Sequence, residues 1–152
     1  MSRAQKAKEY FLSGYACSQA VALAFADVMQ IKEDEIAKYL LPFGGGLGRL
    51  RLTCGAVSGM AFVIGALFAK SENTPENKMT TYALTQQLCD QFKEECGSLI
   101  CGELLKAMEV PVEVGGAPEA RTAQYYQKRS CAEIVEVAAR IVEDYAKEQG
   151  VL

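Results

Sequence analysis

The chain has 152 residues, which is enough for one domain of ordinary size and too few for two. Half of the residues (50%) are hydrophobic and 23% are charged, a composition typical of a globular protein rather than a disordered one. The formal net charge is −3 and histidine is absent, which argues against nucleic-acid binding, Ser-His-Asp or Cys-His catalysis, and imidazole metal ligands. Six cysteines remain as the residues best suited to carry chemistry.

The N-terminal part of the sequence predicts three helices. An amphipathic segment predicts a helix over Arg3 to Ser13. Gly14 is placed to end this helix in the left-handed backbone conformation. Apolar residues at helical spacing predict a second helix over Cys17 to Met29. A third helix over Glu33 to Leu41 ends before Pro42, which cannot continue it.

A glycine-rich loop follows at Phe43 to Gly48 and ends next to Arg49. Glycine allows backbone conformations and close approaches that other residues do not. The loop lacks the lysine–serine pair of a phosphate-binding loop and no strand precedes it, so nucleotide binding is not favoured. We expect it to let the backbone pass close to a cysteine site, with these supporting residues: Gly44, Gly45, Gly46, Arg49 and Gly55.

The segment from Leu52 to Ala69 contains no charged residue over 18 positions, which is near the lower limit for a membrane span. Glycines and small polar residues interrupt it, and no aromatic belt flanks it. We therefore predict a buried central helix over Thr53 to Ala69 and no membrane insertion. Gly55 and Gly59 lie four residues apart on one face, where another backbone can come close.

The C-terminal half predicts three more helices. A long helix covers Glu76 to Glu95, and a shorter one covers Ser98 to Met108. The longest irregular segment runs from Glu109 to Ala117 and contains one proline and two glycines. The last helix begins at Ser130, which forms the spacing of a capping box with Glu133.

No strand, repeat or interdomain linker is evident. The expected fold is all-α, a single domain over residues 1–152 with six or seven helices around the central apolar helix. The uncharged stretch from Tyr10 to Ala26 is similar to a signal peptide, but Glu9 and several polar residues interrupt the pattern. We expect a cytoplasmic protein, in which thiol, metal or catalytic redox chemistry is favoured over structural disulfides.

Four cysteines from four segments fall in the predicted first turn of a helix: Cys17, Cys54, Cys101 and Cys131. Unpaired backbone N–H groups and the positive end of the helix dipole stabilise a thiolate there. No two cysteines have the spacing of thioredoxin-type motifs or zinc ribbons. Cys89 and Cys96 lie late in a long helix, and we expect them to have a structural role.

We expect Cys54 to be the most acidic thiol of the four. It begins the most apolar helix, and Arg49 and Arg51 carry positive charge nearby in sequence. Burial acts in the opposite direction because desolvation disfavours a thiolate. The expectation therefore depends on the glycine-rich loop leaving the sulfur partly accessible.

The cysteines lie within motifs that, in this order, resemble the C_GCAxxG_C_C family of redox-active proteins: Gly14-Tyr15-Ala16-Cys17-Ser18-Gln19, Phe43-Gly44-Gly45-Gly46, Cys54-Gly55-Ala56-Val57-Ser58-Gly59, Gly97-Ser98-Leu99-Ile100-Cys101 and Cys131. The resemblance covers nearly the whole chain. It places the family's four characteristic cysteines on the same four residues that helix position selects, and leaves Cys89 and Cys96 outside the pattern. It implies a small helical redox protein, often linked to electron transfer or iron–sulfur contexts.

Three functions remain open at this point. In the leading hypothesis Cys17, Cys54, Cys101 and Cys131 converge as metal ligands for an iron–sulfur cluster that transfers electrons. In the first alternative the same residues are the catalytic thiols of a metal-free thiol/disulfide oxidoreductase, and in the second they hold a structural zinc ion in an interaction domain. The expected partner is an unidentified redox protein; homo-oligomerisation stays open.

Overall fold

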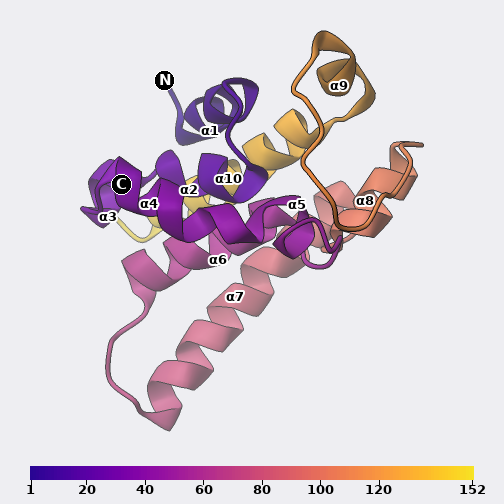
Figure 1. Ribbon diagram of the computed structural model, residues 1–152. Coiled ribbons are helices and arrows are strands. Elements are labelled where there is room, and N and C mark those ends of the chain that lie inside the picture. The colour runs from indigo at the N-terminus through magenta and orange to yellow at the C-terminus, as the bar shows by residue number, and fades with distance from the viewer.

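The most apolar helix, α6 (Gly55–Phe68), lies at the centre of the computed structural model, which describes residues 1–152 (Figure 1). The fold is all-α, as predicted, and its only extended pairing is an isolated bridge between Thr53 and Ile100. The other elements are α1 (Arg3–Leu12), α2 (Cys17–Leu23), α3 (Ala26–Met29), α4 (Glu33–Leu40), the 3₁₀ helix η1 (Leu41–Phe43), α5 (Gly44–Leu47), α7 (Pro75–Cys96), α8 (Cys101–Ala107), α9 (Ala123–Lys128) and α10 (Cys131–Glu148).

The structure has more helical segments than the six or seven expected, because several are short. The predicted helix over Cys17 to Met29 is divided into α2 and α3 at Phe25, whose backbone is not helical and whose side chain is fully buried. No glycine or proline marks this break in the sequence. Helix α9 has six residues, and Thr122 caps it by accepting a hydrogen bond from the N–H of Tyr125.

Helix α6 packs against α2, α7 and α10, which form the layers around it. Two of its three glycines, Gly55 and Gly59, allow α2 to come close, as the sequence predicts. A Cβ atom on Gly59 would lie 2.7 Å from the carbonyl oxygen of Ser18 and 3.0 Å from Cβ of Val21. On Gly55 it would lie 3.2 Å from Cβ of Cys17. The small residues therefore fix the distance between the starts of α2 and α6.

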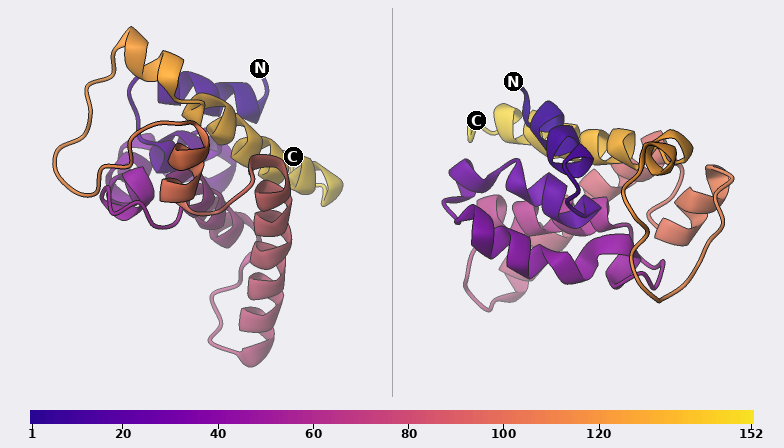
Figure 2. Two further views of the ribbon diagram at one scale, coloured as in Figure 1. Left: turned by 90° about the vertical axis from the view of Figure 1, so that its right-hand side faces the viewer. Right: turned by 45° about the horizontal axis from the view of Figure 1, so that its top comes forward.

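The outer helices differ in how they pack on the rest of the fold. Helix α1 packs on α2 and α10 rather than on α6. The first half of α7 projects away from the rest of the chain (Figures 1 and 2). Only Leu88 and Phe92 of this helix are buried, and both lie in its second half. No helix combines the length and the hydropathy needed to cross a lipid bilayer.

The predicted irregular segment is longer than expected and runs from 109 to 122. It arcs from α8 past α5 to α9 (Figure 2). Two arginines of the glycine-rich region hold it: the Nε of Arg49 donates to the carbonyl of Gly115 at 3.0 Å, and that of Arg51 donates to the carbonyl of Glu113 at 2.8 Å. The N–H of Gly115 in turn donates to the carbonyl of Arg49 at 2.9 Å.

Candidate functional site

One pocket of about 320 Å³ brings together the four cysteines selected from the sequence: Cys17, Cys54, Cys101 and Cys131. The five supporting residues expected around them line the same pocket: Gly44, Gly45, Gly46, Arg49 and Gly55. Cys89 and Cys96 do not line it. Segments that are far apart in the sequence therefore meet at one place, and no two cysteines are joined by a disulfide.

Each of the four cysteines lies at the start of a helix. Cys17, Cys101 and Cys131 are the first residues of α2, α8 and α10, and Cys54 is the N-cap residue of α6. The first N–H groups of a helix have no partner within it, and they carry the positive end of the helix dipole. Four such ends surround the pocket and favour negative charge inside it.

Polar side chains next to Cys17 fix the start of α2. The Oγ of Ser18 donates to the carbonyl of Leu40 at 2.6 Å, and the Nε2 of Gln19 donates to the carbonyl of Ala37 at 2.7 Å. Both acceptors belong to α4. These buried hydrogen bonds hold α2 against α4 and thereby hold Cys17 at the pocket.

The isolated bridge places Cys54 and Cys101 beside each other. The N–H of Cys54 donates to the carbonyl of Leu99 at 2.8 Å, and the N–H of Cys101 donates to the carbonyl of Leu52 at 2.6 Å. Each cysteine therefore directly follows one residue of the short antiparallel pair, Cys54 just before α6 and Cys101 at the first position of α8. The pairing was not evident in the sequence because it is too short to show strand periodicity.

Gly46 makes the close approach that the sequence predicts for the glycine-rich loop. It has a φ of +72°, and a Cβ atom on it would lie 2.6 Å from Cβ of Cys101 and 2.8 Å from the backbone nitrogen of Leu52. Real Cβ atoms do not approach other atoms this closely, so no residue larger than glycine fits without movement. The loop therefore packs directly against the start of α8.

The predicted capping box at the start of α10 is not formed. Ser130 is the N-cap residue, but its side chain makes no capping hydrogen bond. Its backbone ψ of 25° departs from the extended value usual for a capping residue. The carbonyl of Ser130 accepts from the N–H groups of Glu133 and Ile134. The N–H groups beside Cys131 are therefore left without the serine side chain as an acceptor.

Cys131 is the central thiol of the group, because its charge influences Cys17, Cys54 and Cys101. The neighbouring Cys17 thiol lowers the pKa of Cys131, and Arg129 lowers it further. The same interaction raises the pKa of Cys17, and burial adds to this effect. In this tightly coupled pair we therefore assign the proton to Cys17 and the thiolate to Cys131.

The expectation that Cys54 is the most acidic thiol is wrong. Its side chain is only 5% exposed, and burial raises the pKa of Cys54 to about 12. The N–H groups of Ala56 and Val57 act in the opposite direction but do not compensate. Burial also raises the pKa of Cys101, against the effect of Arg51, whose Nη1 lies 3.7 Å from the Cys101 sulfur.

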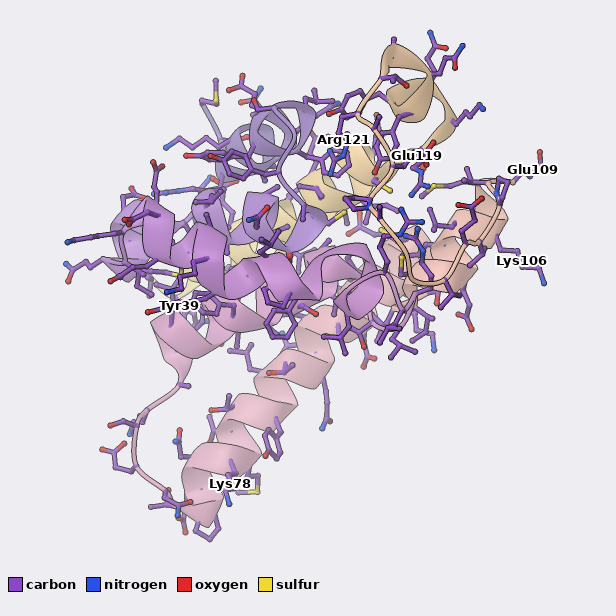
Figure 3. All side chains as sticks on the ribbon, in the orientation of Figure 1. Tyr39, Lys78, Lys106, Glu109, Glu119 and Arg121 are labelled. Carbon is purple, nitrogen blue, oxygen red and sulfur yellow. The ribbon has the colours of Figure 1, made fainter.

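Arg121 also lines the pocket, and sequence reasoning missed it. It stacks over the rings of Phe11 and Tyr125, with its Cζ atom 4.4 Å and 4.9 Å from the two ring centroids. Figure 3 shows Arg121 and Glu119 on the same stretch of loop, beside α9. Arg121 directly precedes Thr122, the cap of α9, and recognising that short helix would have been the signal needed to place it.

The cysteines as arranged do not form a site for a single metal ion. No group of three or more Cys, Asp or Glu side chains in the chain has an arrangement that could hold one ion. A zinc ion requires four ligands at close tetrahedral distances. The donor atoms are suitable for zinc, but their positions in this arrangement do not fit it.

The pKa order can be tested by alkylation of the reduced protein as a function of pH. Only thiolates react, so the rate for each cysteine rises as the pH passes its pKa. We expect Cys131 to reach half of its maximal rate below the ordinary cysteine value of about 8.5. Cys54 should stay unreactive at that pH. Mass spectrometry of individual peptides measures both rates, and faster labelling of Cys54 than of Cys131 would reverse our assignment.

Comparison with known proteins identifies a family that the chain matches. A family model described as "Putative redox-active protein (C_GCAxxG_C_C)" matches residues 15–145. The matched range contains all four pocket cysteines and the glycine-rich loop. No curated protein and no solved structure matches the chain.

Proposed function

The chain belongs to the redox-active C_GCAxxG_C_C family, and from this we propose that it cycles Cys17 and Cys131 between two thiols and a disulfide. One observation carries this proposal: Cys17 and Cys131 both line the pocket, and each thiol is the largest influence on the pKa of the other, as expected of close neighbours. They come from helix starts more than 100 residues apart in the sequence, so a bond between them would also link α2 to α10.

The reaction would begin with the Cys131 thiolate. It attacks one sulfur of a substrate disulfide, a mixed disulfide forms, and one substrate thiolate leaves. Cys17 then passes its proton to the released substrate thiolate and attacks the Cys131 sulfur of the mixed disulfide. The second substrate thiolate leaves, and a Cys17–Cys131 disulfide remains. Two thiols of the protein are oxidised, and one substrate disulfide is reduced to two thiols.

The surroundings support this division of roles. Arg129 and the start of α10 stabilise negative charge on Cys131, which is the attacking group. The interaction with Cys131, together with burial, raises the pKa of Cys17 and keeps it protonated until the mixed disulfide has formed. Cys54 and Cys101 form the second pair of neighbours in the pocket, and their raised pKa values keep both protonated near neutral pH.

The second candidate function is electron transfer by an iron–sulfur cluster. It is favoured by the four cysteines that surround one pocket at four helix starts, because a cluster with thiolate ligands carries negative charge that these ends offset. Cys17, Cys54, Cys101 and Cys131 would be its ligands. A cluster would supply one-electron chemistry.

Anaerobic purification followed by metal and labile-sulfide analysis separates the two functions. We expect a colourless protein that contains neither iron nor sulfide and that loses two hydrogen atoms in mass after mild oxidation. Peptide mapping should then join Cys17 to Cys131. A brown protein with iron and labile sulfide would favour the cluster, and an oxidised protein in which these two cysteines stay unlinked would overturn the proposed pair.

A further inference from the structure

We propose that the same pocket contains a binding site for a small oxyanion or carboxylate, with Arg51 and Arg121 as its principal ligands. The inference goes beyond the thiol reaction proposed above and does not depend on it. It rests on the distribution of charge around the pocket and on the partners of each guanidinium group.

The pocket has a large excess of positive charge. Four of the six arginines of the chain line it (Arg49, Arg51, Arg121 and Arg129), whereas none of the ten lysines does. Glu119 is its only lining carboxylate. The formal charge of these side chains is +3, although that of the whole chain is −3. Arginine is the residue best suited to bidentate recognition of carboxylate and phosphate-type groups.

Arg51 is the residue that most clearly indicates an anion site. It is only 7% exposed and forms no ion pair. Its Nε donates to the carbonyl of Glu113, and its Nη1 faces the Cys101 sulfur at 3.7 Å. Its Nη2 makes no hydrogen bond in the chain, and this atom is not fully buried, because every fully buried side-chain nitrogen has a partner. A guanidinium so nearly buried is costly without a counter-charge.

Arg121 is held in place without using a carboxylate. Its Nη1 and Nη2 donate to the carbonyls of Phe11 and Tyr15, each at 3.0 Å. Together with the aromatic rings around it, these contacts fix the plane of the guanidinium group. A charged group fixed in this way loses little conformational freedom when it binds a ligand.

The other two arginines of the pocket already have acidic partners. Arg129 forms an ion pair with Glu119 at 2.7 Å, and Arg49 lies 3.8 Å from the exposed carboxylate of Glu113. They add to the positive potential but are less available as ligands. The volume of about 320 Å³ suits a small molecule rather than a protein segment. An oxyanion group bound here would lie beside the four cysteines.

Inorganic sulfate is the first probe, measured by isothermal titration calorimetry on the reduced protein at low ionic strength. We expect saturable binding of one sulfate that chloride weakens. Arg51→Gln and Arg121→Gln should each weaken it roughly 10- to 100-fold, the range for a hydrogen bond to a charged group. Arg140→Gln is the matched control, because Arg140 pairs with Glu95 and does not line the pocket. Parallel titrations with phosphate and acetate distinguish a tetrahedral anion from a planar carboxylate.

The variants must first be shown to fold, by circular dichroism and thermal unfolding. If Arg51→Gln fails to fold, Arg121→Gln carries the test alone, since Arg121 lies outside the helices and is only partly buried. A Cys17→Ser/Cys131→Ser double variant should keep sulfate binding, which separates this site from the thiol reaction. Absence of saturable binding to the wild-type protein, or equal weakening by Arg140→Gln, would overturn the proposal.

Discussion

Replacement of Cys131 by serine is expected to abolish the reversible oxidation of the pocket. A serine hydroxyl is close in size to a thiol, but it cannot form a disulfide and does not ionise near neutral pH. Cys131 is also the thiol whose charge influences the other three pocket cysteines. Its loss therefore removes both the attacking group and the central thiol of these four. Cys17→Ser should likewise prevent the disulfide, because it removes the second sulfur.

The measurement is a titration against a dithiol redox buffer under anaerobic conditions, with thiols counted at each potential. The wild-type protein should release two thiols in one two-electron step, and neither serine variant should show that step. Cys96→Ala is the matched control, since Cys96 lies at the end of α7 outside the pocket. If Cys96→Ala removes the step as completely as Cys131→Ser, the site has been assigned to the wrong cysteines.

Local signals in the sequence were sufficient to locate the four cysteines. Each helix start depends on nearby residues, and the structure places Cys17, Cys101 and Cys131 at the first position of a helix and Cys54 one residue before. The glycines that permit close packing could be recognised for the same reason. Helix ends and glycine positions are set mainly by short-range geometry.

Properties that depend on tertiary contacts could not be predicted in this way. The acidity of Cys54 was misjudged because its burial results from the packing of α6 against neighbouring helices. Arg121 was missed because its contact with α1 joins residues 110 positions apart in the sequence. The break between α2 and α3 follows the burial of Phe25 and carries no local signal. In each case a long-range contact overrides the sequence pattern.

The substitution Gly46→Ala in the glycine-rich loop is expected to have the second large effect, a loss of stability. A Cβ atom at this position would collide with Cys101 and with the backbone of Leu52, in a residue whose φ of +72° is already unfavourable for alanine. The left-handed conformation costs about 1–2 kcal/mol, and overpacking adds about 1–3 kcal/mol. We expect the free energy of unfolding to fall by roughly 2–5 kcal/mol, the sum of these two effects.

Gly48→Ala separates the two contributions. Gly48 belongs to the same loop and has a φ of +57°, but a Cβ atom on it would meet only the carbonyl oxygen of Pro42, at 4.0 Å. It should therefore show the conformational cost alone, about 1–2 kcal/mol. Urea denaturation measures both variants, and alkylation of Cys101 reports whether the start of α8 has moved. Because only Gly46 touches Cys101, only Gly46→Ala should change the reactivity of that thiol. Equal destabilisation by the two substitutions would mean that the loop does not pack against α8 in the way described.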